Sequence, residues 1–137
     1  MTERPFRFAV QALKADSAQE WCAFAQQAEE LGYSTLFLAD HLLGRGPAMA
    51  RAPQPTQHLA PLVAMTAAAA ATQTLRVGCR VFCVDYHVPA VLAKEAATLD
   101  LLSNGRLEFG IGAGWNEHEY RAIGLPFKAG PERVSKL

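Results

Sequence analysis

Four short apolar runs alternate with helix-like segments, and this alternation constrains the fold more than any other feature of the sequence. The runs cover residues 6–11, 34–39, 75–84 and 106–111, and the segments 16–32, 58–73 and 89–105 between them have helical patterns. Residues 130–137 begin a fourth helix at Pro131. Because strands joined by helical crossovers are parallel, the sequence predicts one α/β domain over residues 1–137.

The ends of the first predicted helix are the most clearly marked. Ser17 and Glu20 have the spacing of a capping box, in which each side chain satisfies a free amide of the first turn. Gly32 suits the left-handed residue that commonly ends a helix. After the second strand, residues 41–57 are rich in Gly, Pro, Arg and Ala and predict a long irregular connection with a functional or mobile role.

Two architectures fit this order of elements, a doubly wound open sheet and part of a (β/α)₈ barrel. In both, ligands bind at the carboxyl ends of the strands. That rule places residues 40–41, 84–87 and 112–115 on one edge, so we expect the functional site there.

The run GIGAGWNEHEY, residues 110–120, tests whether this edge binds a dinucleotide. A dinucleotide loop has the spacing G-x-G-x-x-G, follows the first strand and opens a helix. Here the spacing is G-x-G-x-G, the run follows the fourth strand, and residues 114–126 have the composition of a loop. The sequence therefore argues against a dinucleotide-binding fold.

Composition excludes several classes of function. The formal net charge is zero and the 13 Lys and Arg residues are scattered, so no nucleic-acid partner is expected. No apolar run is long enough to span a membrane, and the N-terminus lacks the apolar core of a secretory signal, so we predict a cytoplasmic protein. The three cysteines lack the spacing of metal ligands and predict buried thiols without a metal site.

Two long stretches resemble the luciferase-like monooxygenase superfamily. These are LGYSTLFLADH, residues 31–41, and VPAVLAKEAATLDLLSNGRLEFGIGAGWNEHEYRAIGLPF, residues 88–127, and the likeness is closest to the branch that uses the deazaflavin coenzyme F420. The resemblance implies a (β/α)₈ barrel that binds F420 or, alternatively, FMN at its carboxyl-end rim. It also implies an oxidoreductase, usually a homodimer, that transfers a hydride to or oxygenates a small organic substrate.

Carried over to this sequence, the resemblance implies two catalytic residues. His41 would donate a hydrogen bond or exchange a proton near the reacting edge of the ring, and Asp40 would orient it. The alternative for His41 is a solvated histidine at a strand end.

The resemblance also implies a set of cofactor-binding residues. The bond Cys83–Val84 falls where relatives often have a bulge with a non-prolyl cis peptide behind the ring; the alternative is a plain strand end. The loop that approaches the cofactor would comprise Gly110, Gly112, Gly114 and Trp115, with Trp115 either forming a wall of the pocket or packing as core beneath the loop.

Trp115 stands where some relatives carry a carboxylate that donates a proton, so that acid is absent. Glu117 and Glu119 are expected to be solvated loop carboxylates. Arg80 and Lys94 are expected to have structural or solvated roles rather than to contact the cofactor.

The length of the chain leaves two classes of function open. Barrels of this type have about 250 residues, so 137 residues cover the N-terminal half, strands one to four, and stop within the fourth helix. One reading is an F420- or flavin-dependent oxidoreductase; the other is a truncated, inactive half-barrel or fragment that needs a partner.

Overall fold

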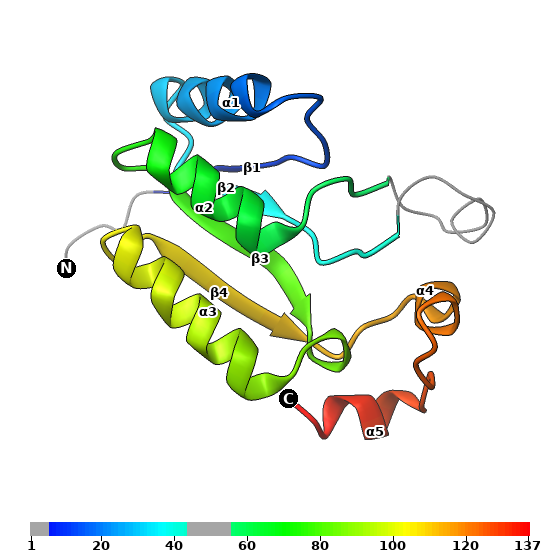
Figure 1. Ribbon diagram of the computed structural model, residues 1–137. Helices are drawn as coiled ribbons and strands as arrows, with labels where there is room; N and C mark the ends of the chain where they lie inside the picture. The colour runs from blue at the N-terminus through cyan, green and yellow to red at the C-terminus, as the bar shows by residue number, and fades with distance from the viewer. Residues whose placement is uncertain (1–5, 44–55) are drawn as a thin grey trace.

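The computed structural model describes residues 6–43 and 56–137 and shows a four-stranded parallel sheet with the order β1-β2-β3-β4 (Figure 1). The strands are β1 (Ala9–Gln11), β2 (Thr35–Leu38), β3 (Arg76–Cys83) and β4 (Leu107–Gly112). The connecting helices are α1 (Ala18–Glu30), α2 (Pro61–Ala71) and α3 (Pro89–Leu102). Three short elements complete the chain: the 3₁₀ turn η1 (Val84–Tyr86) after β3, then α4 (Glu117–Ala122) and α5 (Gly130–Val134) after β4.

The hydrophobic core lies between one face of the sheet and α1, α2 and α3. Leu36 of β2 is in register with Val77 of β3, and Leu38 is in register with Cys79, so all four side chains lie on one face. All four are buried in a single cluster with residues of the three helices. A sheet in sequential order with its helices on one face is part of a barrel rather than a doubly wound sheet, which confirms the predicted α/β class.

The opposite face of the sheet is more polar. Gln11 accepts a hydrogen bond from Arg80 at 2.9 Å, and the carboxylate of Glu108 pairs with Arg76 at 2.9 Å. The ring of Phe37 lies over Gly78, where an added Cβ would come within 2.6 Å of the ring. In a (β/α)₈ barrel, the sheet face opposite the helices lines the interior.

Local signals predicted the first helix well. The Ser17 hydroxyl accepts from the amide of Glu20 at 3.1 Å, while the Glu20 carboxylate accepts from the amide of Asp16 at 2.8 Å. Gly32 has φ +80°, as a left-handed helix end requires. The Trp21 indole then ties α1 to α2 by donating to the carbonyl of Ala64 at 2.8 Å.

Two boundaries differ from prediction. β1 begins at Ala9 rather than at residue 6, and Phe6 and Phe8 are largely exposed. Residues 114–126, predicted as a loop, contain α4, because acids in its first turn and Arg121 in its last suit the helix dipole. Residues 44–55 of the predicted long connection lie outside the described residues.

The carboxyl ends of the strands, together with α4 and α5, form the edge that the sequence marks as functional (Figure 1, orange and red). Among residues 6–43 and 56–137, no helix is long and apolar enough to cross a membrane.

Candidate active site

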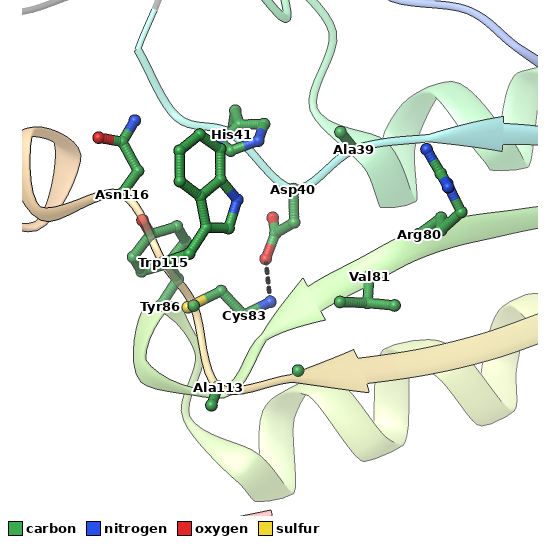
Figure 2. A pocket seen from close by; sticks show the side chains of 12 residues that line it. Ala39, Asp40, His41, Arg80, Val81, Cys83, Tyr86, Ala113, Trp115 and Asn116 are labelled. Carbon is green, nitrogen blue, oxygen red and sulfur yellow. Dashed lines mark hydrogen bonds between the residues drawn. The ribbon is translucent and has the colours of Figure 1, made fainter. Parts of the chain in front are cut away.

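A cavity of about 270 Å³ opens at the carboxyl ends of β2, β3 and β4. Six of the residues singled out in the sequence line it: Asp40, His41, Cys83, Gly112, Gly114 and Trp115 (Figure 2). The remaining lining residues are Ala39, Arg80, Val81, Tyr86, Ala113 and Asn116. Gly110 and Val84 lie outside this lining, and Val84 instead lines a second cavity beside Phe109.

Asp40 is a buried carboxylate at the end of β2. Its Oδ2 accepts from the amide of Cys83 at 2.8 Å (Figure 2). The same oxygen accepts from Nε2 of His87 at 2.7 Å. The bond to Asp40 raises the pKa of His87 above its ordinary value, against the opposing effect of burial. Oδ1 of Asp40 is buried without a hydrogen-bond partner among the described residues.

His41 is held by Glu119, for which the sequence predicted no role in the site. Its Nδ1 lies 2.8 Å from Oε2 of Glu119, whose side chain is fully buried. The expectation that Asp40 orients His41 is therefore wrong: Asp40 bonds to His87, and Glu119 bonds to His41. The expectation that Glu119 is solvated is wrong as well.

Glu119 receives hydrogen bonds from two parts of the chain, the segment after β2 and η1. Oε1 accepts from the amides of Leu42 at 2.6 Å and Leu43 at 3.3 Å, and Oε2 also accepts from the Tyr86 hydroxyl at 3.1 Å. Burial acts to raise the pKa of Glu119, but the bonds from His41 and the amides outweigh it and lower that pKa. The carboxylate is therefore ionised near neutral pH.

A helical stripe was the signal that could have located Glu119. Asn116, Glu119, Tyr120 and Ile123 have the i, i+3, i+4, i+7 spacing of one helix face, and the first three are buried. The glycines and the proline around this stripe favoured a loop instead, and an acid on a loop is normally solvated.

Trp115 forms part of the cavity wall. It is 53% exposed, so it is not core beneath the loop. Its indole meets the His41 ring edge to face, with centroids 5.9 Å apart and an interplanar angle of 83°. Glu119 and Trp115 thus restrain the imidazole from two sides.

The glycines of the run make room for the protein's own side chains. A Cβ on Gly110 would lie 3.1 Å from a methyl group of Val81, and one on Gly112 would lie 2.5 Å from the other. Gly114 has φ +72°, and a Cβ there would meet the Tyr120 hydroxyl and the sulfur of Cys83. Packing therefore explains the absence of side chains at all three positions.

A non-prolyl cis peptide is present on β3, but at Arg80–Val81 rather than at Cys83–Val84. The pairing of β3 with β4 shifts register between Cys79 and Phe82, whereas Cys83 pairs regularly with Gly112. The irregular part of the strand thus lies three residues before the position expected, and both Arg80 and Val81 line the cavity.

Cys83 and Tyr120 form a buried pair beneath the rim. The Cys83 sulfur lies 3.1 Å from the Tyr120 hydroxyl, which also lies 2.9 Å from Oδ2 of Asp85. Burial raises the pKa of Cys83, so its thiol stays protonated and is a poor nucleophile. The three cysteines are free thiols, and no metal-binding group of side chains occurs in the described part of the chain.

The two basic residues of the prediction have separate surroundings. Arg80 donates to Gln11 and also lines the cavity, where it is the one Lys or Arg among the lining residues described. Lys94 lies between α2 and α3 on the outer surface, away from the cavity.

Comparison with known proteins identifies the family. The chain matches the luciferase-like monooxygenase family over residues 4–135. It is 34% identical over 122 residues to an F420-dependent glucose-6-phosphate dehydrogenase of Beutenbergia cavernae, covering 84% of this chain and 32% of that relative.

Two solved structures share the fold. The coenzyme F420-dependent tetrahydromethanopterin reductase of Methanopyrus kandleri has a TM-score of 0.71 and 24% identity, covering 88% of this chain and 30% of that one. A riboflavin lyase solved with modified FMN and riboflavin has a TM-score of 0.79 and 22% identity, covering 96% and 35%. The chain thus spans about a third of these relatives' length, and it belongs to the luciferase-like monooxygenase family.

Proposed function

We propose that this chain forms the ring-binding end of an oxidoreductase site that uses coenzyme F420, with FMN as the alternative cofactor. The substrate would be a small organic molecule that is reduced, oxidised or oxygenated beside His41. The observation that carries the proposal is that His41, held by the buried carboxylate of Glu119, lines a cavity whose walls are the indole of Trp115 and small residues. The F420-dependent relative supports F420 as the first choice, and the riboflavin lyase supports FMN as the alternative.

The cavity fits a flat ring system better than a whole cofactor. Its volume of about 270 Å³ is below the ~300–1,000 Å³ of typical small-molecule sites. Ala39, Val81, Ala113 and Trp115 provide apolar walls against which a ring can stack. The unpartnered Oδ1 of Asp40 is suited to accept a hydrogen bond from a ring N–H.

When bound, F420 would carry a hydride, whereas reduced FMN would activate dioxygen. The chain's own residues would position the substrate and the ring and would transfer protons. His41 would exchange a proton with the substrate, because an imidazole can act as a general acid or base and this one lines the cavity. Trp115 would cover the ring and limit the access of water.

Fluorescence titration with F420, oxidised FMN and reduced FMN tests binding. We expect saturable binding of at least one cofactor, with F420 bound most tightly. Failure of all three to bind would reject the proposal and leave the inactive half-barrel as the reading of this chain.

Turnover of a histidine variant then tests the catalytic role. His41→Ala should lower kcat by about 10²–10⁴-fold, the typical contribution of general acid–base catalysis, while changing cofactor affinity little. His118→Ala is the matched control, since His118 is an exposed histidine on α4. An unchanged kcat in His41→Ala would refute the role of His41.

A homodimer and a cytoplasmic location stay predictions.

A further inference from the structure

We propose that Glu119 is a positioning residue that fixes His41 as the tautomer protonated on Nδ1, leaving the lone pair on Nε2. The tautomer follows from contacts within the chain. Only its catalytic consequence, that Nε2 is the atom that takes a proton from the substrate, rests on the proposed function.

The contact between the two side chains permits one direction of hydrogen bonding. Nδ1 of His41 lies 2.8 Å from Oε2 of Glu119, and an ionised carboxylate accepts hydrogen bonds but cannot donate them. A neutral imidazole has one N–H, so that proton must be on Nδ1. The lowered pKa of Glu119 keeps the carboxylate ionised where the imidazole is neutral.

The carboxylate itself cannot easily rotate away. Two consecutive amides, of Leu42 and Leu43, donate to Oε1, and the Tyr86 hydroxyl donates to Oε2. These donors come from the segment after β2 and from η1, while Glu119 is on α4. Three elements of the rim therefore set the orientation of one imidazole ring.

This arrangement makes the effect of Glu119→Gln specific. The two backbone amides require an acceptor, so they will hold the new amide oxygen in place of Oε1. The new NH₂ group then faces Nδ1, which must become the acceptor, and the proton moves to Nε2. The substitution should therefore switch the tautomer of His41 while preserving the shape of the side chain.

Nitrogen-15 NMR of the protein labelled in its histidine rings tests the inference without a cofactor. At a pH where the ring is neutral, we expect a protonated Nδ1 and an unprotonated Nε2 for His41. The signals are assigned by their loss in His41→Asn. A protonated Nε2 in the wild-type protein, or a mixture of tautomers, would overturn the proposal, and this measurement needs no substitution of Glu119.

Three variants extend the test. Glu119→Gln should switch the tautomer, whereas Glu117→Gln, an exposed acid on the same helix, should not. Tyr86→Phe removes one donor to Oε2 but leaves the His41 contact, so the Nδ1–H tautomer should persist. A folded Glu119→Gln protein that retains Nδ1–H would contradict the proposal.

Kinetics separate a positioning role from a merely structural one. Glu119→Gln should lower kcat by about 10–100-fold, as is typical when the partner that orients a histidine is replaced, with KM nearly unchanged. Equal kcat in Glu119→Gln and Glu117→Gln would refute the catalytic consequence. Loss of cofactor binding in a protein that keeps Nδ1–H refutes the proposed function alone, while binding in a protein with Nε2–H refutes this inference alone.

Discussion

Replacing Gly114 by Ala tests the packing that seats the rim loop. Gly114 has φ +72°, and an added Cβ would meet the hydroxyl of Tyr120 and the sulfur of Cys83 at 2.7 Å. Tyr120 is fully buried and bonded to Asp85, so its ring has little freedom to move aside. Gly124 is the matched control, because its φ is +79° but nothing lies within 4 Å of its added Cβ.

The two substitutions share one cost and differ in another. A left-handed conformation costs a non-glycine residue roughly 1–2 kcal/mol, and both alanine variants incur it. Only Gly114→Ala also overpacks a buried contact, which typically costs about 1–3 kcal/mol. We therefore expect Gly124→Ala to lower the free energy of unfolding by about 1–2 kcal/mol and Gly114→Ala by about 2–5 kcal/mol.

Urea denaturation, followed by circular dichroism at neutral pH, measures both free energies of unfolding. The decisive quantity is the difference between the two variants, since the shared backbone cost cancels. Equal destabilisation would mean that the contact with Tyr120 does not constrain the loop, and would refute the packing explanation for this glycine.

Two further predictions concern pH. Burial acts to raise the pKa of Glu29, but hydrogen bonds from the amides of residues 73–75 outweigh it and lower that pKa from 4.5 to about 2. Its contribution to the free energy of unfolding is therefore present above pH 4.5 and lost as pH falls toward 2. Urea denaturation at a series of pH values should show that Glu29→Gln flattens the dependence of the free energy of unfolding on pH in this range, whereas Glu30→Gln does not. The bond to Asp40 raises the pKa of His87, so this bond stabilises the fold fully below pH 6.5 and less as pH rises through the folded-state pKa. Asp40→Asn should lower the pKa of His87 measured by NMR. An unchanged pKa would contradict this cause.

The order of elements and the location of the site could be predicted because both depend on local pattern. Apolar runs, the cap at Ser17 and the glycine at position 32 each act within a few residues. Once the strands are known to be parallel, their carboxyl ends must meet at one edge, and that rule brought Asp40, His41 and Trp115 together.

The contacts within the site could not be predicted, because they join residues far apart in the chain. His41 and Glu119 are 78 positions apart. The helical stripe around Glu119 could have placed its side chain on a buried face, but nothing near it in the sequence identifies His41 as its partner. The cis peptide at Arg80–Val81 lies where the register between β3 and β4 shifts, between Cys79 and Phe82, and no pattern in the sequence marks that shift. The role of the glycines likewise emerged only when Val81 and Tyr120 were seen to occupy the space beside them.

Hydrogen–deuterium exchange with and without a saturating cofactor tests the central claim, that the ring binds at this rim. With F420, and separately with FMN, the account predicts slower exchange in peptides covering residues 39–43, 80–86 and 110–116, which contain the residues that line the cavity. Exchange in the outer surface of α2 and α3, around Thr66 and Thr98, should stay unchanged. Protection confined to that outer surface, or no protection at the rim when the cofactor is bound, would contradict the account.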